Sequence, residues 1–335
     1  MDVFTDVYSK SVDLLKTKCF DDRWSNIEPK LKALLAAGGP NDAEAAVLDL
    51  IRHSLNVVAR KENGSDAVAQ EILEISRYKS AGFEERAALL KTIRHFYFVN
   101  RAGNQSIWVC DGPKAYHKWA YDLFPGKAVG HIKGSLQHDH ETFGGGNRKM
   151  FSEALQLTRK WSADVVAKLG KPDDDAIKAA RRWFHTAGAS DDDVKKTAKV
   201  LLDGFKKISA TCNSTHVIFS DRPHKRADPG FRDVVASVNA GDTMPVIYIF
   251  KLFLKAGKRN RRGHIGKLWY CALTIVHELS HKLAGTDDIQ YDTSGLKPNA
   301  TFTPAQSLKN ADSWAYFAAD LVGALSRDTL DTVYQ

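Results

Sequence analysis

The sequence predicts an α+β protein that is predominantly helical. Residues 3–100 and 149–208 carry apolar side chains at intervals of three and four, the spacing of one helix face. After them, residues 215–254 contain short runs rich in β-branched and aromatic residues, which are typical of strands. An apolar stretch without proline follows at 267–284 and ends at Gly285. We therefore expect a small sheet that leads into a largely buried helix.

The first 102 residues are expected to form a separate helical bundle. Their apolar periodicity is interrupted at 38–41, 63–65 and 80–82 by turn-forming residues, so about five helices with short connections fit. The segment contains no pattern that indicates chemistry. We assign residues 1–102 to an N-terminal domain of unknown role.

Residues 103–146 are interpreted as a connector. It contains a strand-like run at 106–110, a helical pattern at 116–123 and three glycines at 144–146 that suit a hinge. The cluster from His138 to Glu141 is either a metal site or a solvated loop, and we favour the loop because its neighbours do not make a strand.

The remaining elements follow from caps and composition. Helices are predicted at 149–169, 174–184 and 191–208, with Pro172 and Ser190 as start signals. Strands are predicted at 215–219, 233–238 and 246–254. A last helical stretch begins at Pro304 and should cover the helix at 267–284.

Composition and sequence pattern indicate in which compartment the protein works. The chain has 335 residues and no run of about twenty apolar residues, so no membrane span is expected. Its start lacks the pattern of a signal peptide, and we expect a cytoplasmic protein or one exported by a secretion system that is independent of signal peptides. The cysteines are widely spaced, which favours buried free thiols over disulfides: Cys19, Cys110, Cys212 and Cys271.

The formal charge of +8 does not by itself indicate nucleic-acid binding. The basic residues are dispersed, and the one cluster, at 255–262, lacks the interleaved aromatic residues that stack on bases. A solvated loop explains this cluster, so no nucleic-acid partner is expected.

Two histidines on the apolar stretch have the spacing of a metal site. His277 and His281 are four residues apart, which places them about 40° apart around a helix and one turn apart along it. Glu278 lies between them, where a carboxylate can accept a proton from a metal-bound water. The alternative is that both histidines are hydrogen-bonded core residues.

A third ligand is expected just beyond the helix. Catalytic zinc takes three protein ligands and a water. Gly285 turns the chain, and two carboxylates follow at once, so one of them can fold back toward the histidines. We choose Asp288 over Asp287, with Asp312 as the fallback.

These residues resemble the aspzincins, the deuterolysin and peptidyl-lysine metalloendopeptidase family of zinc proteases. The family pattern is present in order: His277-Glu278-Leu279-Ser280-His281, Gly285-Thr286-Asp287-Asp288, Tyr291 and Asn310-Ala311-Asp312 with aromatic residues behind it. The resemblance is specific over about 265–320 and vague back to about 145. It implies one Zn²⁺ ion held by His277, His281 and Asp288. It further implies Glu278 as general base, Tyr291 as the hydroxyl that stabilises the oxyanion, and a zincin-like catalytic domain over 147–335.

Asp312 carries the expected substrate specificity. It can be a partner of a zinc-bound histidine, the floor of the substrate pocket or a structural cap, and we assign it to substrate binding. In lysine-specific relatives a glutamate lies three positions later, where this chain has Ala315. With one carboxylate instead of two, the resemblance implies a broad preference for basic residues after the scissile bond.

We expect a zinc-dependent metalloendopeptidase that acts on proteins or peptides, with a role as a toxin or effector delivered without a signal peptide. The alternative is a catalytically vestigial protein in which the metal stabilises a binding or scaffolding domain. The sequence leaves the oligomeric state open.

Overall fold

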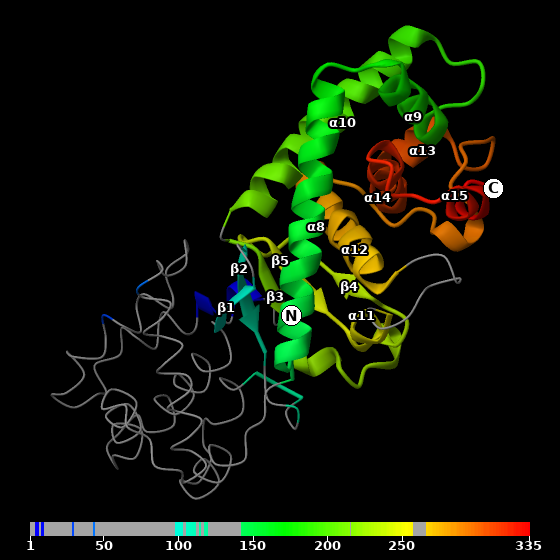
Figure 1. Ribbon diagram of the computed structural model, residues 1–335. Coiled ribbons are helices and arrows are strands. Elements are labelled where there is room, and N and C mark those ends of the chain that lie inside the picture. The colour runs from blue at the N-terminus through cyan, green and yellow to red at the C-terminus, as the bar shows by residue number, and fades with distance from the viewer. Residues whose placement is uncertain are drawn as a thin grey trace, which may run out of the picture. The chain divides into compact units, whose positions relative to one another are not determined.

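The computed structural model (Figure 1) describes part of the chain in detail. The described residues are 4–6, 8–9, 29, 43, 98–102, 105–111, 114, 117–119, 142–214, 216–256 and 266–335. Most of the predicted N-terminal bundle and the cluster His138–Glu141 lie outside them.

The chain divides into two compact units. The first comprises 1–148, 215–234 and 241–250, and the second comprises 149–214, 235–240 and 251–335. The domain boundaries predicted from the sequence, at 102 and 146, stay predictions.

The first unit contains a sheet with the order β1-β2-β3-β5. The strand β1 (Phe98–Ala102) pairs antiparallel with β2 (Gln105–Cys110). The strands β3 (Ile218–Ser220) and β5 (Val246–Ile249) continue the sheet in parallel. The strand predicted at 106–110 is confirmed. Two short 3-10 helices, η1 (Pro223–Lys225) and η2 (Pro229–Phe231), begin at prolines, which suit a first helical position.

Two predictions for the first unit were wrong. Phe98 was placed in a helix, but it pairs with Val109 across the β1–β2 ladder, and this pairing overrides the helical spacing of residues 89–98. Of the helix predicted at 116–123, residues 117–119 are described, and they are not helical. Trp119 is buried, but residues 117–119 form no regular element.

Three helices of the second unit confirm their predictions. They are α8 (Gly145–Gly170), α9 (Asp174–Phe184) and α10 (Asp191–Asn213). Side-chain caps fix two of the starts, since Asp173 accepts from the N–H of Ala176 and Ser190 from that of Asp193. The helix α8 begins at Gly145, so the glycines expected to form a hinge lie partly in its first turn.

The strand predicted at 246–254 is too long. It ends at Ile249, and α11 (Lys251–Ala256) follows. A continued strand would place Lys251, Phe253 and Lys255 on one face, whereas a helix separates the buried Phe253 from two exposed lysines. The strand predicted at 233–238 is reduced to β4 (Ala236–Ser237).

The remaining helices surround α12 (Lys267–Ala284), which was predicted with these bounds. The helical stretch predicted from Pro304 is divided at Asn310 into α13 (Pro304–Lys309) and α14 (Ala311–Leu321). The short η3 (Asp292–Ser294) precedes them, and α15 (Arg327–Val333), which was not predicted, closes the chain. Figure 1 shows α9, α13 and α14 grouped beside α10.

Aromatic side chains form the core between α9, α10 and α14. Phe205 stacks on Trp314 with ring centroids 5.4 Å apart, and Phe184 meets Phe317 edge to face at the same distance. Trp183 stacks on Tyr316 at 6.1 Å. On another side of α12, the hydroxyl of Thr158 in α8 donates to the carbonyl of Ala272. The helix α12 is therefore held in a fixed position by a rigid core.

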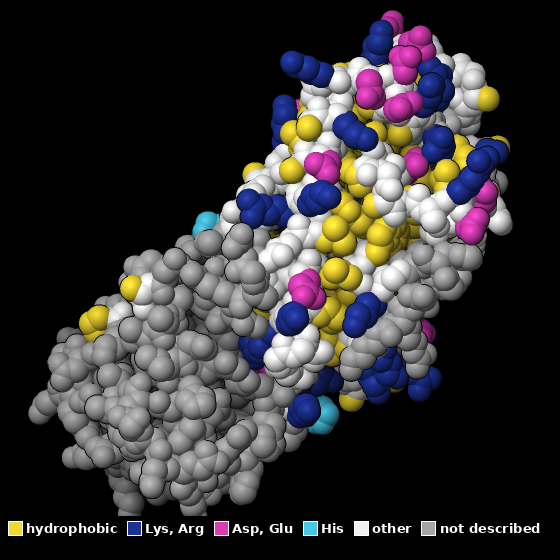
Figure 2. All heavy atoms as spheres, in the orientation of Figure 1, with side chains coloured by type: hydrophobic (Ala, Val, Ile, Leu, Met, Phe, Trp, Pro, Cys, Tyr) yellow, Lys and Arg dark blue, Asp and Glu magenta, His cyan; other side chains and the backbone are white. Residues whose placement is uncertain are grey.

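Charged side chains of both signs cover the surface near α9 and α10. Figure 2 shows basic and acidic groups interspersed there, and three ion pairs join them: Lys178–Asp175, Arg181–Asp191 and Lys196–Asp193. Among the described residues, no helix combines the length and apolar character needed to cross a membrane.

The contact between α10 and α14 yields a test of the core. A Cβ added to Gly204 would lie 2.4 Å from the Trp314 ring, which is fixed by its hydrogen bond to the carbonyl of Leu308. Gly204→Ala should lower stability, because overpacking costs about 1–3 kcal/mol and outweighs the gain of about 1 kcal/mol in helix propensity. Gly170→Ala, where a Cβ meets open space, is the control for a denaturant titration. A Gly204→Ala midpoint at or above the control would contradict this packing.

Candidate metal centre

The C-terminal half of α12 brings two imidazoles together. The Nε2 atoms of His277 and His281 lie 3.1 Å apart, with the rings nearly perpendicular. The helix ends directly after them because Gly285 adopts a left-handed conformation, with φ of 67°, and its N–H bonds to the carbonyl of Ser280. The chain then turns back toward the histidines.

Asp288 completes a group of three metal-binding side chains. Its Oδ1 lies 3.0 Å from Nε2 of His277 and 3.3 Å from Nε2 of His281. The ligand atoms of all three residues fall within 4.8 Å of one another. Asp287, the rejected candidate, instead pairs its backbone with Asn310 in a parallel bridge. The geometry thus unites the three residues that the sequence proposed.

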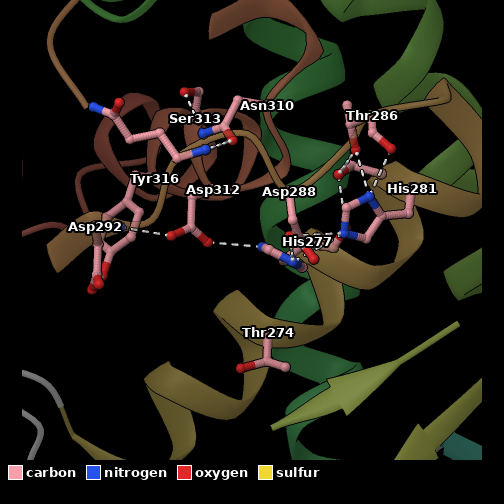
Figure 3. A network of polar contacts seen from close by, with 12 residues as sticks. Thr274, His277, His281, Thr286, Asp288, Asp292, Asn310, Asp312, Ser313 and Tyr316 are labelled. Carbon is pink, nitrogen blue, oxygen red and sulfur yellow. Dashed lines mark hydrogen bonds and ion pairs between the residues drawn. The ribbon is translucent and has the colours of Figure 1, made fainter. Parts of the chain in front are cut away.

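A second layer of hydrogen bonds fixes both rings (Figure 3). The Nδ1 of His277 lies 2.8 Å from Oδ1 of Asp312, and the Nδ1 of His281 lies 2.7 Å from the carbonyl oxygen of Thr286. Because these oxygens accept, each Nδ1 carries the proton and each Nε2 of a neutral ring directs its lone pair to the other ligands.

This donor set fits a zinc ion. Two imidazole lone pairs and a carboxylate oxygen converge, and with neutral rings there is no proton among them to relieve their repulsion. Their separations of 3.0–3.3 Å are close to the edge of about 3.3 Å of a tetrahedron with zinc–ligand bonds of about 2.0 Å. Three protein ligands also leave a fourth position for water, as catalytic zinc requires.

The pKa values of the cluster also favour a bound cation. Burial alone would lower the pKa of His277, but hydrogen bonds to Asp288 and Asp312 outweigh it, and the pKa lies well above its usual value. For Asp288, burial would raise the pKa, yet the hydrogen bonds from His277 and His281 hold it well below the usual range. Without a metal, positive charge reaches this carboxylate as protons, which a bound cation would replace.

Glu278 lies beside the cluster and is nearly inaccessible, with 5% of its surface exposed. Burial raises the pKa of this carboxyl, although the two histidines lower it in part. The N–H of Val238 donates to it. The same segment accepts a bond of 3.0 Å from Nζ of Lys282 to the carbonyl of Asn239, so residues 238–239 are tied to α12 near Glu278. A buried carboxylate with a raised pKa suits proton transfer near neutral pH.

Tyr291 lies at the exposed edge of the cluster. Its hydroxyl is hydrogen-bonded to Asp288, and 52% of the residue is exposed. Partial burial and the negative charge of Asp288 raise the pKa of Tyr291 to about 12. The phenol therefore keeps its proton at neutral pH and can donate a hydrogen bond.

Asp312 lies behind His277, on the first turn of α14. One oxygen bonds to His277 and the other accepts the N–H of Asp292 at 2.9 Å. These contacts match the first role that the sequence left open, that of a partner of a ligand histidine. Its assignment to substrate binding stays a prediction.

Several residues that shape the site had no role in the prediction from the sequence. The carbonyl of Thr286 orients His281, and Asp292 accepts a bond of 2.6 Å from the hydroxyl of Tyr316 (Figure 3). The side chain of Asn310 accepts two backbone N–H groups of the ligand loop. Asn310 belongs to the Asn-Ala-Asp motif, which was the available signal.

The helix with His-Glu-x-x-His and the aspartate beyond it define a metal centre of the metallopeptidase type. Comparison with known families agrees: residues 171–319 match the family model of the aspzincins, described as lysine-specific metallo-endopeptidases. Over these residues the chain is similar to the aspzincin family. The resemblance predicted from the sequence is confirmed over residues 171–319.

Two curated relatives share a short segment with this chain. An extracellular protease of Aeromonas hydrophila is 49% identical over 47 residues, which are 13% of this chain and 14% of that protein. A peptidyl-Lys metalloendopeptidase of Pleurotus ostreatus is 47% identical over 47 residues, which are 13% of this chain and 28% of that protein. The chain thus matches less than a third of the length of either relative.

The two neighbouring aspartates allow a matched test of the ligand set. Asp288→Ala should lose most bound zinc because it removes the only carboxylate in the three-residue group, whereas Asp287→Ala should retain it. Atomic emission measures the zinc content of both purified variants against wild type and shows which aspartate is the ligand. Equal retention in both variants would remove Asp288 from the metal centre.

Proposed function

We propose that the protein is a zinc-dependent metalloendopeptidase that hydrolyses peptide bonds in proteins or peptides, with one zinc ion per chain. The observation that carries the proposal is the convergence of His277, His281 and Asp288 beside the buried carboxylate of Glu278. The match of residues 171–319 to a metalloendopeptidase family supports it.

Different side chains would perform metal binding and proton transfer. His277, His281 and Asp288 would hold the ion, which when bound would acidify a water and polarise the scissile carbonyl. Glu278 would accept a proton from the attacking water and pass it to the leaving amine. Its raised pKa and the bond from Val238 hold it ready for both transfers.

Tyr291 would stabilise the developing oxyanion. Its hydroxyl is protonated at neutral pH, lies at Asp288 and is accessible from solvent. A donor aimed at the place where negative charge develops lowers the barrier more than it strengthens substrate binding. The hydrogen bond to Asp288 would be exchanged for one to the substrate.

The general base gives the test that separates catalysis from scaffolding. Glu278→Gln keeps the size of the side chain, so fold and zinc content should be unchanged. Peptide cleavage should fall by about 10²–10⁴-fold, the usual contribution of a general base. A chromogenic peptide assay run beside zinc analysis and thermal unfolding provides the measurement. Zinc-loaded wild-type protein that cleaves nothing would instead support the vestigial, metal-stabilised binding protein.

We further propose a broad preference for basic residues after the scissile bond. The family model is described as lysine-specific, and one carboxylate of the expected pocket, Asp312, is present. That carboxylate already accepts bonds from His277 and Asp292, and the buried Ala315 adds no second charge. Attraction for lysine and arginine should therefore be moderate and shared by both.

A cleavage map of a mixed peptide pool measures this preference. Lysine and arginine should both be enriched directly after the cut, and a chelator should abolish all cleavage. Asp312→Asn alone is a weak test of this preference, because it also alters the partner of His277. The cleavage map of the wild type therefore provides the test. An absence of basic enrichment would mean that Asp312 does not attract the substrate.

The described cysteines fit a protein that does not depend on disulfides. Cys110, Cys212 and Cys271 are free and buried. Burial raises the pKa of Cys212 and of Cys271 to about 12, so both are poorly reactive thiols. A role as a delivered toxin or effector stays a prediction from the sequence.

A further inference from the structure

The junction between α13 and α14 is attached to the loop that carries Asp288. Asn310 forms this junction and is completely buried. We propose that Asn310 is a positioning residue of the metal centre, which holds the ligand loop so that Asp288 faces the two histidines. The inference rests on the proposed metal site.

Both polar atoms of the Asn310 carboxamide form hydrogen bonds. Its Oδ1 accepts the N–H of Ile289 at 3.0 Å and that of Gln290 at 2.9 Å. Its Nδ2 donates to Oγ of Ser313 at 3.1 Å, and Ser313 is itself completely buried. Ile289 and Gln290 directly follow Asp288, so one side chain fixes the peptide units behind the ligand.

The same junction binds the loop on both sides of Asp288. Before it, the N–H of Asp287 donates to the carbonyl of Lys309 at 2.7 Å, and the N–H of Ala311 donates to the carbonyl of Asp287 at 3.1 Å. After it, the N–H of Asp292 donates to Asp312. The ligand loop is thus attached to residues 309–312 at 287, 289–290 and 292.

The ligand loop must be held by hydrogen bonds, because its side chains make little apolar contact with the rest of the protein. Ile289 is 40% exposed, Tyr291 is 52% exposed, and the Asp288 side chain is 45% exposed. A loop with such exposure gains little from apolar contacts. Losing the Asn310 carboxamide would leave two N–H groups without their acceptor and free the backbone that aims Asp288.

The orientation of the amide is specified as well. Ser313 accepts from Nδ2, so the oxygen of the carboxamide, and not its nitrogen, faces the two N–H groups of the loop. An aspartate at 310 would keep an acceptor in this place, whereas alanine would not. This difference separates positioning from simple filling of space.

The chain offers a matched control in another loop. Oδ1 of Asn299 also accepts two consecutive backbone N–H groups, those of Thr301 at 2.8 Å and Phe302 at 2.9 Å. Asn299 belongs to neither the metal group nor its hydrogen-bonding partners. Asn299→Ala therefore removes the same kind of interaction without touching the ligand loop.

The test is zinc affinity of the full-length protein, measured by competition with a chromophoric chelator, beside thermal unfolding of the metal-free form. Asn310→Ala should weaken zinc binding by about 10–100-fold, as loss of an outer-shell partner does. Asn299→Ala should stay within about threefold of wild type, and Asn310→Asp should recover most of the affinity lost by alanine. Both metal-free variants should fold, and Asn310→Ala should unfold at the lower temperature, because Asn310 is buried whereas water can replace the exposed Asn299.

The outcomes separate this inference from the proposed function. A wild type that binds no zinc overturns the metal centre and the inference with it. A wild type that binds zinc, with Asn310→Ala as tight as Asn299→Ala, overturns the inference alone. If Asn310→Ala does not fold, Ser313→Ala replaces it as the test variant, since it removes only the bond that orients the amide. Weaker zinc binding by Ser313→Ala supports the positioning role, and unchanged affinity overturns it.

Discussion

The structure depends on holding three hydrogen-bond acceptors against their mutual repulsion. The Nε2 atoms of His277 and His281 and the carboxylate of Asp288 lie 3.0–3.3 Å apart. A flexible chain would separate such groups, and only a cation or protons among them makes the arrangement favourable. The surrounding protein must therefore impose the geometry, and three residues behind the ligands, Thr286, Asp292 and Asn310, are buried.

Two different devices provide this rigidity. The histidines belong to α12, which is packed among aromatic and aliphatic side chains and whose register fixes their separation. Asp288 lies on an exposed loop and depends on the backbone of residues 287–292 being bonded to the α13–α14 junction. The core formed by Phe205, Trp314 and Phe317 fixes α14, so the aromatic layer determines the position of the third ligand through that junction.

The parts of the site that could be predicted are those encoded by local signals. The bounds of α12 follow from its apolar stretch without proline and from Gly285, and the spacing of the ligand histidines follows from the helical repeat. The break at Asn310 could not be predicted, because neither glycine nor proline marks it and it is stabilised by contacts with a loop about twenty residues earlier. For the same reason the sequence left the role of Asp312 open: its partners His277 and Asp292 are distant in the chain.

Strand boundaries show the other limit of local reasoning. The run from Val246 to Leu254 has strand composition throughout, yet it becomes helical at Lys251, where alternation would place a lysine on each side of a buried phenylalanine. Composition favoured a strand, and the separation of charged from buried side chains favoured a helix. Tertiary burial decided between them, and this information is absent from composition alone.

In the proposed function, Asp312 serves both the metal centre and the choice of substrate. Its two oxygens accept from His277 and from the backbone of Asp292, so a substrate cation would have to share an acceptor that already orients a ligand. A second carboxylate at position 315 would relieve this competition, but Ala315 is buried and uncharged. A strongly bound lysine would draw Asp312 away from His277 and weaken the metal site. The proposed preference for basic residues is therefore moderate, because a strong one would compete with the orientation of His277.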